Sequence, residues 1–306
     1  MSKPDRVDWL LVGTSEIARN RVAAALAALD TGRLVGVCGS DKKRVDDLAD
    51  AHGAGERYID LDEALGKTTA NVVYVATPVY RHTPEALQAM DAGKHVLIEK
   101  PLALSAADAA PVLEKARTTG LCAGCAFYRR TYPRYQHVRK MLDSGEFGNI
   151  VLVRTMYFSW FDPLPGDPKR WRVTKDESGG GPLSDLGSHM FDLIIGLFDL
   201  PRSVVAKVKT LTHGYEVEDS SAIIMELPSG APVIAGFCWN SKTWTHEFEI
   251  VGTEAKVRWH PADTGNVIVT VGRDVRELEM PNAENVHTPL VEDFAHAVLD
   301  RRDPIV

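Results

Sequence analysis

Short apolar runs alternate with helical segments through residues 1–127, and this order constrains the fold more than any other feature of the sequence. The runs have the length of strands and lie at Val7–Val12, Leu34–Cys38, Tyr58–Ile59, Val72–Ala76, His95–Ile98 and Leu121–Phe127. The segments between them have helical spacing and lie at Glu16–Leu29, Asp41–His52, Leu61–Leu65, Pro84–Ala92 and Ala106–Thr118. Such alternation predicts βαβ units with right-handed crossovers, and hence a doubly wound parallel sheet.

The rest of the chain, residues 128–306, has a different pattern. Helices are predicted at Pro133–Ser144 and Asp185–Leu197, with a strand at Ile150–Phe158 and a loop at Ser159–Pro182 between them. Further strands follow closely at Ser203–Thr210, Ser220–Glu226, Val233–Trp239, Thr245–Val251, Lys256–Trp259, Val267–Val271 and Arg276–Glu279. This order predicts an α+β domain with a large, mostly antiparallel sheet. A length of 306 residues suits these two domains, 1–127 and 128–306.

Composition excludes several classes of protein. The apolar fraction is 44% and the charged fraction 25%, as in ordinary globular chains. A formal net charge of −7 disfavours a nucleic-acid partner. No apolar run reaches the ~18 residues needed to cross a membrane, and Met1–Arg6 leads into a strand without the apolar stretch of a signal peptide. We therefore expect a cytoplasmic protein.

The cysteines are too few and too scattered for a disulfide scaffold. Cys122 and Cys125 are spaced as Cys-x-x-Cys, but they lie in an apolar run rather than at a helix start. We interpret them, with Cys38 and Cys238, as inert and mostly buried thiols.

A glycine-containing turn follows the first predicted strand and consists of Gly13, Thr14, Ser15, Glu16 and Ile17. This is the position of the dinucleotide-binding turn in a Rossmann fold, where helix N–H groups favour a pyrophosphate. Gly13 permits the tight turn and Ala18 is small enough for helix–strand packing, but Ser15 replaces the usual second glycine. An ordinary βα turn is the alternative, and the repeated strand–helix alternation that follows favours cofactor binding.

The end of the second predicted strand bears on the choice of nicotinamide cofactor. NAD sites usually have Asp or Glu there for the ribose 2′-hydroxyl, whereas a 2′-phosphate needs small polar groups and cations. Gly39 occupies the expected acidic position, and Ser40 with Lys43 or Arg44 could hold a phosphate. Asp41 is the alternative ribose ligand, and the basic residues are also compatible with a solvated helical turn. The sequence predicts a preference for NADP(H), with NAD(H) as the alternative.

Four further motifs follow in order. They are Ala76-Thr77-Pro78 with His82, Gly93-Lys94-His95-Val96 leading to Glu99-Lys100-Pro101, Ala126-Phe127-Tyr128-Arg129-Arg130, and Gly179-Gly180-Gly181 leading to Asp185 and His189. With the Gly13 turn, they resemble the glucose–fructose oxidoreductase/inositol dehydrogenase (Gfo/Idh/MocA) family over most of the chain. The sequence departs from the family at Ser15 and at Tyr128, where many members have Asn. Many members also add a helix after the position of Val306, so we expect a short member or a trimmed chain.

The resemblance implies a two-domain NAD(P)-dependent oxidoreductase acting on sugars, inositols or related polyols, and an oligomer formed through the C-terminal sheet. It maps the family lysine to Lys100 and the family Asp-x-x-x-His pair to Asp185 and His189. It also implies cofactor contacts from the segments that contain these motif residues: Thr77, Pro78, His82, Glu99, Lys100 and Pro101.

Hydride transfer explains these residue types. A partly desolvated lysine such as Lys100 can exchange a proton or polarise a carbonyl, and Pro101 would fix its turn while Glu99 orients neighbours. Asp185 and His189 are spaced to share one helix face, where histidine can exchange a proton near neutral pH. Asp192 continues that stripe, so a metal site is a chemical alternative, but no further ligand set supports one and we predict none. The other alternative for Asp185 is a helix N-cap.

Four residues are candidates for substrate contact besides Asp185 and His189, namely Tyr128, Arg129, Trp171 and Arg172. Aromatic faces suit sugar rings, although aromatic residues could equally fix the loop or form a subunit contact. The favoured function is a sugar or polyol oxidoreductase with Lys100 and His189 in proton transfer. Two alternatives remain: a relative that cleaves glycosides through transient NAD-dependent oxidation, and a non-catalytic cofactor-sensing regulator.

Overall fold

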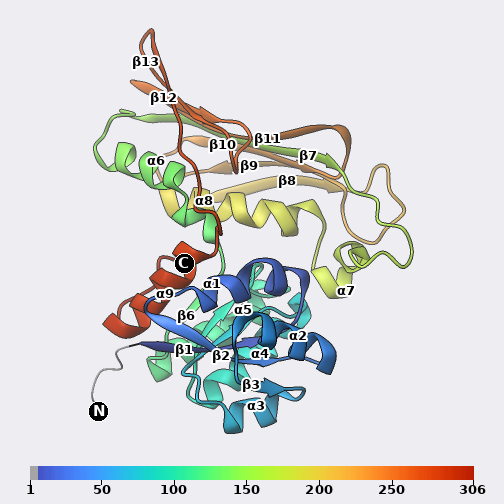
Figure 1. The fold of residues 1–306 in the computed structure, drawn as a ribbon. Helices are drawn as coiled ribbons and strands as arrows, with labels where there is room; N and C mark the ends of the chain where they lie inside the picture. The colour runs from blue at the N-terminus through green and yellow to red at the C-terminus, as the bar shows by residue number, and fades with distance from the viewer. Residues whose placement is uncertain (1–5) are drawn as a thin grey trace. The chain divides into compact units, whose positions relative to one another are not determined.

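The computed structural model describes residues 6–306, which form two compact units (Figure 1). One unit consists of the described part of Met1–Tyr128 together with Ala283–Val306, and the other is Arg129–Asn282. The boundary after Tyr128 is one residue from the boundary expected from the sequence. The final segment, Ala283–Val306, belongs to the first unit instead of the second. Apolar packing accounts for this, because Phe294 from helix α9 (Thr288–Asp300) is buried with its ring 5.7 Å from that of Trp9.

The first unit contains a six-stranded parallel sheet with the strand order β3-β2-β1-β4-β5-β6. Its strands are β1 (Val7–Val12), β2 (Gly32–Cys38), β3 (Glu56–Tyr58), β4 (Val72–Val75), β5 (His95–Ile98) and β6 (Ala123–Cys125). This order is that of a doubly wound Rossmann sheet, which confirms the predicted fold of this part. The central strands are buried on both faces, as expected for a parallel sheet between helices.

The helices of this unit are η1 (Ala18–Val22), α1 (Ala23–Ala27), α2 (Lys42–His52), α3 (Leu61–Lys67), α4 (Val79–Asp91), α5 (Ala106–Thr119) and α9. Several begin at side-chain caps: Asp41, Asp60 and Ser105 each accept a hydrogen bond from the first turn of their helix. Two differences from the predicted elements stand out. The first helix contains the π-helix η1, and α4 starts at Val79 with Pro84 inside it.

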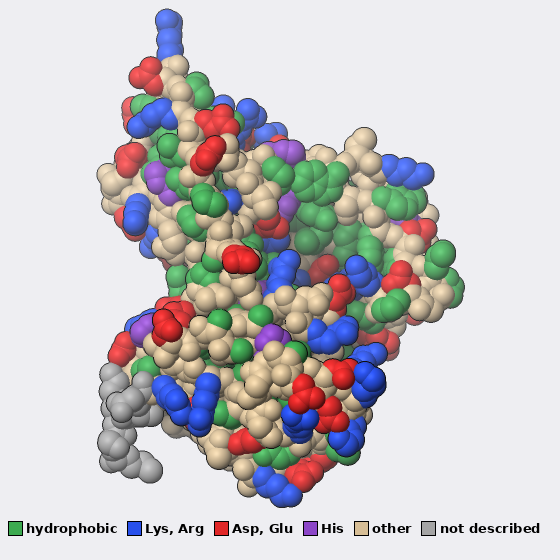
Figure 2. Space-filling model, in the orientation of Figure 1, with side chains coloured by type: hydrophobic (Ala, Val, Ile, Leu, Met, Phe, Trp, Pro, Cys, Tyr) green, Lys and Arg blue, Asp and Glu red, His purple; other side chains and the backbone are tan. Residues whose placement is uncertain are grey.

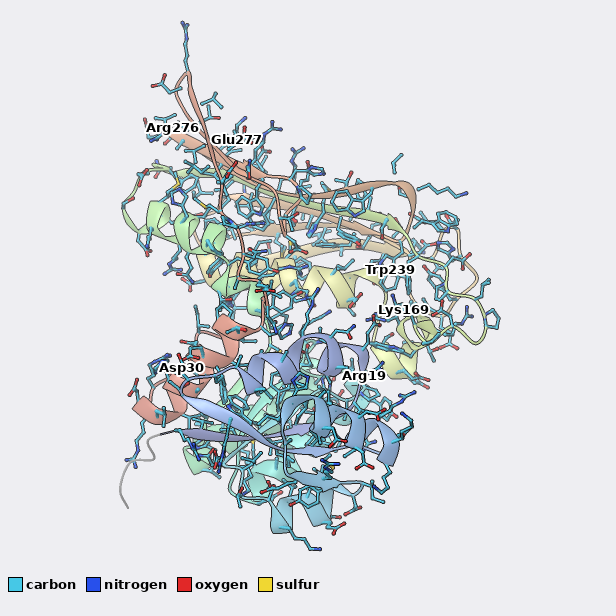
Figure 3. The ribbon with its side chains drawn as sticks, viewed as in Figure 1. Arg19, Asp30, Lys169, Trp239, Arg276 and Glu277 are labelled. Carbon is cyan, nitrogen blue, oxygen red and sulfur yellow. The ribbon has the colours of Figure 1, made fainter. Side chains whose placement is uncertain are left out.

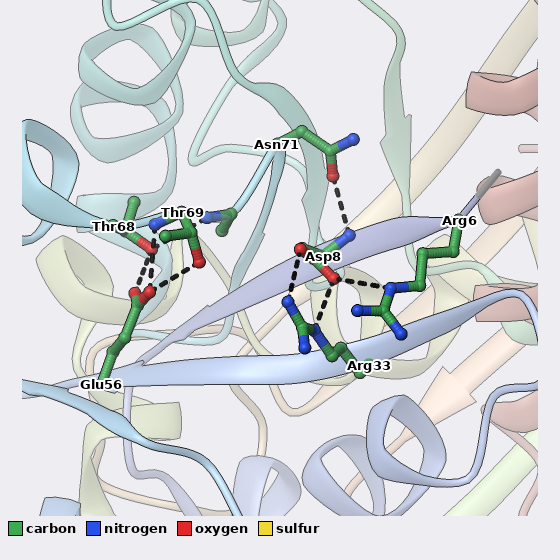
Figure 4. Close-up of polar contacts among 8 residues, drawn as sticks. Arg6, Asp8, Arg33, Glu56, Thr68, Thr69 and Asn71 are labelled. Carbon is green, nitrogen blue, oxygen red and sulfur yellow. Dashed lines mark hydrogen bonds and ion pairs between the residues drawn. The ribbon is translucent and has the colours of Figure 1, made fainter. Parts of the chain in front are cut away.

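Polar side chains join β1 to β2, and join β1 and β3 to the segment before β4 (Figure 4). Arg33 donates to Asp8 at 2.8 Å, and the Asp8 backbone N–H donates to Asn71 Oδ1 at 2.9 Å. Glu56 accepts from the hydroxyls of Thr68 and Thr69 at 2.5 and 2.7 Å. These contacts hold the connection before β4 in place.

The second unit is built on an eight-stranded sheet with the order β14-β13-β12-β11-β7-β10-β9-β8. Its strands are β7 (Ile150–Trp160), β8 (Ser203–Lys209), β9 (Ser220–Glu226), β10 (Pro232–Cys238), β11 (Asn240–Gly252), β12 (Ala255–Trp259), β13 (Val267–Val271) and β14 (Asp274–Leu278). The strand pairings in this sheet are antiparallel except that of β10 with β7, which is parallel. The predicted large, mostly antiparallel sheet is confirmed.

Helices cover one face of this second sheet (Figure 1). They are α6 (Pro133–Asp143) and α8 (Ser188–Phe198), with the π-helix η4 (Leu183–Gly187) leading into α8. Phe191 of α8 lies edge-on to Phe237 of β10 at 5.6 Å between ring centroids. A Cβ at Gly196 would lie 2.4 Å from Tyr135 Oη, so glycine permits the close approach of α6 and α8. Across residues 6–306, no helix combines the length and apolar character needed to cross a bilayer.

Candidate functional site

The turn after β1 has the geometry of a dinucleotide-binding turn. Gly13 has a φ of +108°, and a Cβ on it would lie 2.5 Å from the carbonyl oxygen of Ala76 at the end of β4. Only glycine fits there. Ser15 serves the following helix, since its Oγ accepts from Ala18 N–H at 3.4 Å, and Arg19 projects from η1 (Figure 3). Thr14, Ser15 and Ile17 are half-buried and Glu16 is exposed, and binding of a pyrophosphate at this first helical turn remains a prediction.

The end of β2 carries no acidic side chain toward this turn. β2 ends at Cys38, and a Cβ on Gly39 would lie 2.9 Å from Thr14 Cγ2. Asp41 is instead the N-cap of α2, where its Oδ1 accepts from Arg44 N–H at 3.1 Å. Its other oxygen lies 3.5 Å from Arg44 Nε, and Lys43 is paired with Asp47 at 2.6 Å. Asp41 is thus occupied at a helix terminus, which weakens its interpretation as a ribose ligand.

The surface around α2 and α3 is mixed in charge. Basic and acidic side chains are interspersed there, at the lower right of Figure 2. Exposed pairs such as Lys42–Asp46 and Lys67–Glu63 lie on these helices, with nitrogen–oxygen distances of 2.6 and 2.7 Å. A ligand phosphate would therefore meet cations that already have carboxylate partners.

His82 joins the loops that follow β4 and β5. Its ring is buried, with Nδ1 2.9 Å from the carbonyl oxygen of Pro101 and Nε2 2.9 Å from that of Thr77. Thr77 in turn donates its hydroxyl to Glu85, and burial raises the pKa of Glu85 above its usual range. The structure therefore shows His82 holding the backbone of two motif segments together, and a direct cofactor contact from its ring remains a prediction.

Glu99 lies in the interior of the first unit beside Lys100. Its Oε2 accepts the Lys100 backbone N–H at 3.1 Å, while its Oε1 accepts from Tyr74 Oη at 2.7 Å. His287 Nε2 lies 3.3 Å from the same Oε1. Burial acts to raise the pKa of Glu99, but the hydrogen bonds from His287 and Tyr74 and the charge of Lys100 outweigh it and lower that pKa. Lys100 itself is half-buried at the carboxyl edge of the sheet.

Tyr128 and Arg129, both candidates for substrate contact, have buried positions. The Tyr128 ring lies 4.8 Å from that of His287 in the first unit. Arg129, in the second unit, forms a two-pronged ion pair with Asp263 at 2.5 and 2.7 Å. Burial acts to raise the pKa of Asp263, but Arg129 outweighs it and keeps the pKa low. The geometry of Arg129 fits a structural role, and substrate contact by either residue remains a prediction.

The second unit brings three predicted substrate residues together. Arg172 Nε lies 3.8 Å from Asp185 Oδ2, and the Arg172 guanidinium stacks over the Trp171 ring at 4.6 Å. His189 follows on α8 and is buried, while Asp185 is half-buried in η4. Since the helical segment starts at Leu183 without a side-chain cap, the N-cap alternative for Asp185 is not supported. An acid, a cation and an aromatic face thus meet beside a helix that carries a buried histidine.

The loop before this group is fixed by its own aromatics as well. Phe161 packs against Trp239 with 4.7 Å between ring centroids, and Tyr215 Oη donates to the Phe161 carbonyl at 3.3 Å. Trp239 is labelled in Figure 3, as is Lys169 of the loop. Aromatic packing therefore fixes this part of the loop, and substrate contact by Trp171 remains a prediction.

Glu218 is a site residue that sequence reasoning missed. Its two carboxylate oxygens accept the backbone N–H groups of Gly181 and Leu183 at 2.8 and 3.0 Å, at the start of η4. A Cβ on Gly181 would lie 2.0 Å from the Glu218 carbonyl oxygen, which explains why glycine stands there. No local pattern could have revealed this contact, because Glu218 is distant in sequence and lies in no motif.

Asp192 has a structural partner. Its carboxylate lies 2.7 and 2.9 Å from two nitrogens of Arg130, and burial raises its pKa to about 6 in spite of that partner. Within the described ranges, no group of three or more His, Cys, Asp or Glu side chains is arranged to hold a metal ion. Burial also raises the pKa of Cys38 to about 12 and of Cys122 to about 11, which disfavours reactive thiolates.

Two family models match the chain. Residues 7–127 match the oxidoreductase family with an NAD-binding Rossmann fold, and residues 135–258 match the GFO/IDH/MocA C-terminal domain. The chain belongs to the GFO/IDH/MocA family. A member named 1,5-anhydro-D-fructose reductase, from Ensifer adhaerens, is 32% identical over 303 residues, which cover 97% of this chain and 89% of that protein.

Solved structures share the fold along nearly the whole chain. Aldose-aldose oxidoreductase from Caulobacter crescentus, complexed with glycerol, has a TM-score of 0.89 at 23% identity, covering 98% of this chain and 92% of that one. Levoglucosan dehydrogenase in complex with NADH has a TM-score of 0.88 at 20% identity, covering 97% and 91%. Membership of the GFO/IDH/MocA family makes this chain an NAD(P)-dependent dehydrogenase or reductase.

Proposed function

We propose that the chain interconverts a hydroxyl and a carbonyl group of a sugar or polyol-like substrate, with NADP(H) as the preferred cofactor. The observation that carries the proposal is the group of Asp185, Arg172 and Trp171 beside the buried His189. An aromatic face with hydrogen-bonding groups at its edge suits a sugar ring. The relative from Ensifer adhaerens, named as a reductase of 1,5-anhydro-D-fructose, supports this substrate class.

Each residue has a defined task in this proposal. The nicotinamide supplies or accepts the hydride. Reduction of a carbonyl also needs one proton at the oxygen, and oxidation of the alcohol releases it. We assign that proton exchange, and polarisation of the oxygen, to Lys100 and His189. Asp185 binds a neighbouring hydroxyl or orients the His189 ring.

The NADP(H) preference rests on the end of β2. Gly39 leaves no carboxylate for a 2′-hydroxyl, and Asp41 is bound to the N-terminus of α2. Ser40 is exposed beside Lys43 and Arg44, so a 2′-phosphate can approach the Ser40 hydroxyl and compete with Asp47 and Asp41 for these two exposed cations. We expect NADPH to bind more tightly than NADH in a fluorescence titration. In the S40A variant the ratio of the two affinities should be smaller. Equal affinities in the unmodified protein would contradict the preference.

The decisive experiment is a turnover assay on the full chain. The substrates are 1,5-anhydro-D-fructose and panels of monosaccharides, inositols and their keto forms, each with both cofactors and with nicotinamide absorbance as the readout. The K100M variant should lose about 10²- to 10⁴-fold in turnover while NADPH binding persists. Undiminished turnover would remove Lys100 from the chemistry. Sugar release without net cofactor change would indicate the glycoside-cleaving alternative, and cofactor binding without any turnover would indicate a regulator.

We further propose a homo-oligomer formed through the sheet face opposite α6 and α8. Val205, Ile224 and Ile234 are directly opposed across β8, β9 and β10, and they are 73%, 58% and 38% exposed. A row of exposed apolar side chains across three strands is typical of an interaction surface. Light scattering should give a multiple of the chain mass, and I224K should yield monomers. V271K, at an exposed valine of β13, is the control; a monomeric unmodified protein would contradict the proposal.

A further inference from the structure

A buried polar cluster connects the Glu99–Lys100 turn to the last segment of the chain. Tyr74 of β4, Glu99 after β5 and His287 before α9 contribute its side chains, and all three are buried. Glu99 Oε1 accepts from Tyr74 Oη at 2.7 Å and lies 3.3 Å from His287 Nε2, whereas Oε2 accepts the Lys100 N–H. The Glu99 carboxylate thus links two distant parts of the sequence, at Tyr74 and His287, to the backbone of Lys100.

Hydrogen bonds fix the backbone of His287, and an aromatic neighbour packs against its ring. Its backbone N–H donates to Asn285 Oδ1 at 3.0 Å, its carbonyl accepts from Val291 N–H at 3.0 Å, and the Tyr128 ring lies 4.8 Å away. Among residues 6–306, Nδ1 of His287 has no hydrogen-bond partner. A buried N–H without an acceptor is costly, so the geometry assigns the ring proton to Nε2, which faces Glu99.

The surroundings of Glu99 make these donors important. The titratable groups that face it are Tyr74 from β4, His287 from the segment before α9, and Lys100 next in sequence. A carboxylate buried in the interior stays ionised and fixed only when such groups compensate its lost hydration. If one donor is removed, the carboxylate can protonate or rotate, and the Lys100 N–H loses a defined acceptor.

We propose that His287 is a positioning residue for Lys100: by donating from Nε2 to Glu99 Oε1, it fixes the carboxylate that holds the Lys100 backbone. The inference deepens the proposed function and rests on the role given there to Lys100. His287 itself touches neither substrate nor cofactor in this scheme.

The test compares three histidine variants of the full chain. H287F keeps a ring and removes the donor, H287Q keeps a side-chain N–H, and H296F changes an exposed histidine of the same helix, α9. We expect H287F to lower kcat by about 10- to 100-fold, the effect of a small misplacement of a reacting group. NADPH affinity and substrate KM should stay within about threefold, since His287 touches neither ligand in this scheme. H287Q should regain most of kcat, and H296F should match the unmodified protein.

Two further measurements separate positioning from packing. The kcat–pH profile should shift in H287F, because Glu99 loses a group that favours its ionised form, and should return in H287Q. In ¹⁵N NMR of the unmodified full chain, His287 should carry its proton on Nε2. Equal loss of kcat in H287F and H287Q with an unchanged pH profile, or a ring protonated on Nδ1 alone, would overturn the inference.

K100M in the same assay distinguishes the two proposals. If K100M retains turnover, the proposed function of Lys100 fails and the positioning role fails with it. If K100M is inactive while H287F keeps both kcat and its pH profile, only the positioning role is wrong.

Discussion

The buried pair of Asp192 and Arg130 predicts a pH dependence of stability with an unusual sign. Burial raises the pKa of Asp192 from 3.8 to about 6, although Arg130 is bound at 2.7 and 2.9 Å. The folded state therefore binds the Asp192 proton more tightly than the unfolded chain does. Well below pH ~4 both states carry that proton. Between pH ~4 and about 6 only the folded state retains it, so the free energy of unfolding falls, and above about 6 both states lose the proton and the fall levels off.

The size of the effect follows from the two pKa values. The difference between about 6 and 3.8 corresponds to roughly 3 kcal/mol, at ~1.4 kcal/mol per unit. D192N has nearly the shape of the protonated carboxyl and cannot ionise, so its stability lacks this dependence. We expect the free energy of unfolding of the unmodified protein, relative to D192N, to decrease by about 3 kcal/mol between pH ~2 and pH ~7, with most of the decrease above pH ~4.

Urea unfolding at a series of pH values, followed by circular dichroism, measures this difference. Titration of all other groups cancels between the two proteins, so the difference isolates position 192. D143N is the matched control, because Asp143 is exposed and pairs with Arg139 on α6. Parallel curves for D192N and the unmodified protein would refute the reasoning. If the unmodified protein instead becomes more stable relative to D192N as the pH rises, Arg130 outweighs burial.

Three further predictions concern the motif segments. G13A should weaken NADPH binding by about tenfold or more in a fluorescence titration, because its Cβ would meet the Ala76 carbonyl at a strained φ; an unchanged affinity would contradict this. E218Q should cost about 1 kcal/mol in urea unfolding, because it removes the charge at the start of η4; equal stability would exclude that role. H82A should weaken NADPH binding and lower the melting temperature together, since His82 joins two loops of one unit; a change in only one of them would argue against the joint role.

The regular elements of both sheets could be predicted because their signals are local. β1, β5, β9 and β13 have the predicted bounds, since each is a short apolar or alternating run. The segment that became η1 was predicted as helix, but a π-turn depends on hydrogen-bond register, which composition does not encode. Helix α9 has spacing that would have identified it, with Pro289 in its first turn and Leu290, Val291, Phe294 and Val298 on its buried side.

The residues of the candidate site also differ in whether a local sequence signal could reveal them. Lys100, Asp185 and His189 could be proposed because they belong to short motifs, and the Gly13 turn because it opens a repeated alternation of strands and helices. Glu218 and His287 could not be proposed, because their importance lies in hydrogen bonds to segments far away in sequence. Arg129 is the opposite case: it belongs to a motif and was predicted to contact substrate, but its side chain forms a buried ion pair with Asp263.

The position of His287 gives a physical reason why the final segment joins the first unit. Phe294 in α9 contributes apolar burial against Trp9, but apolar burial alone does not specify one arrangement. A hydrogen bond from His287 to the buried Glu99 is directional, and leaving that carboxylate without its donor is costly. The same contact that orients the Lys100 turn therefore also selects the docking of α9. Loss of the His287 donor should consequently affect both the chemistry and the attachment of the segment, with H287Q restoring both.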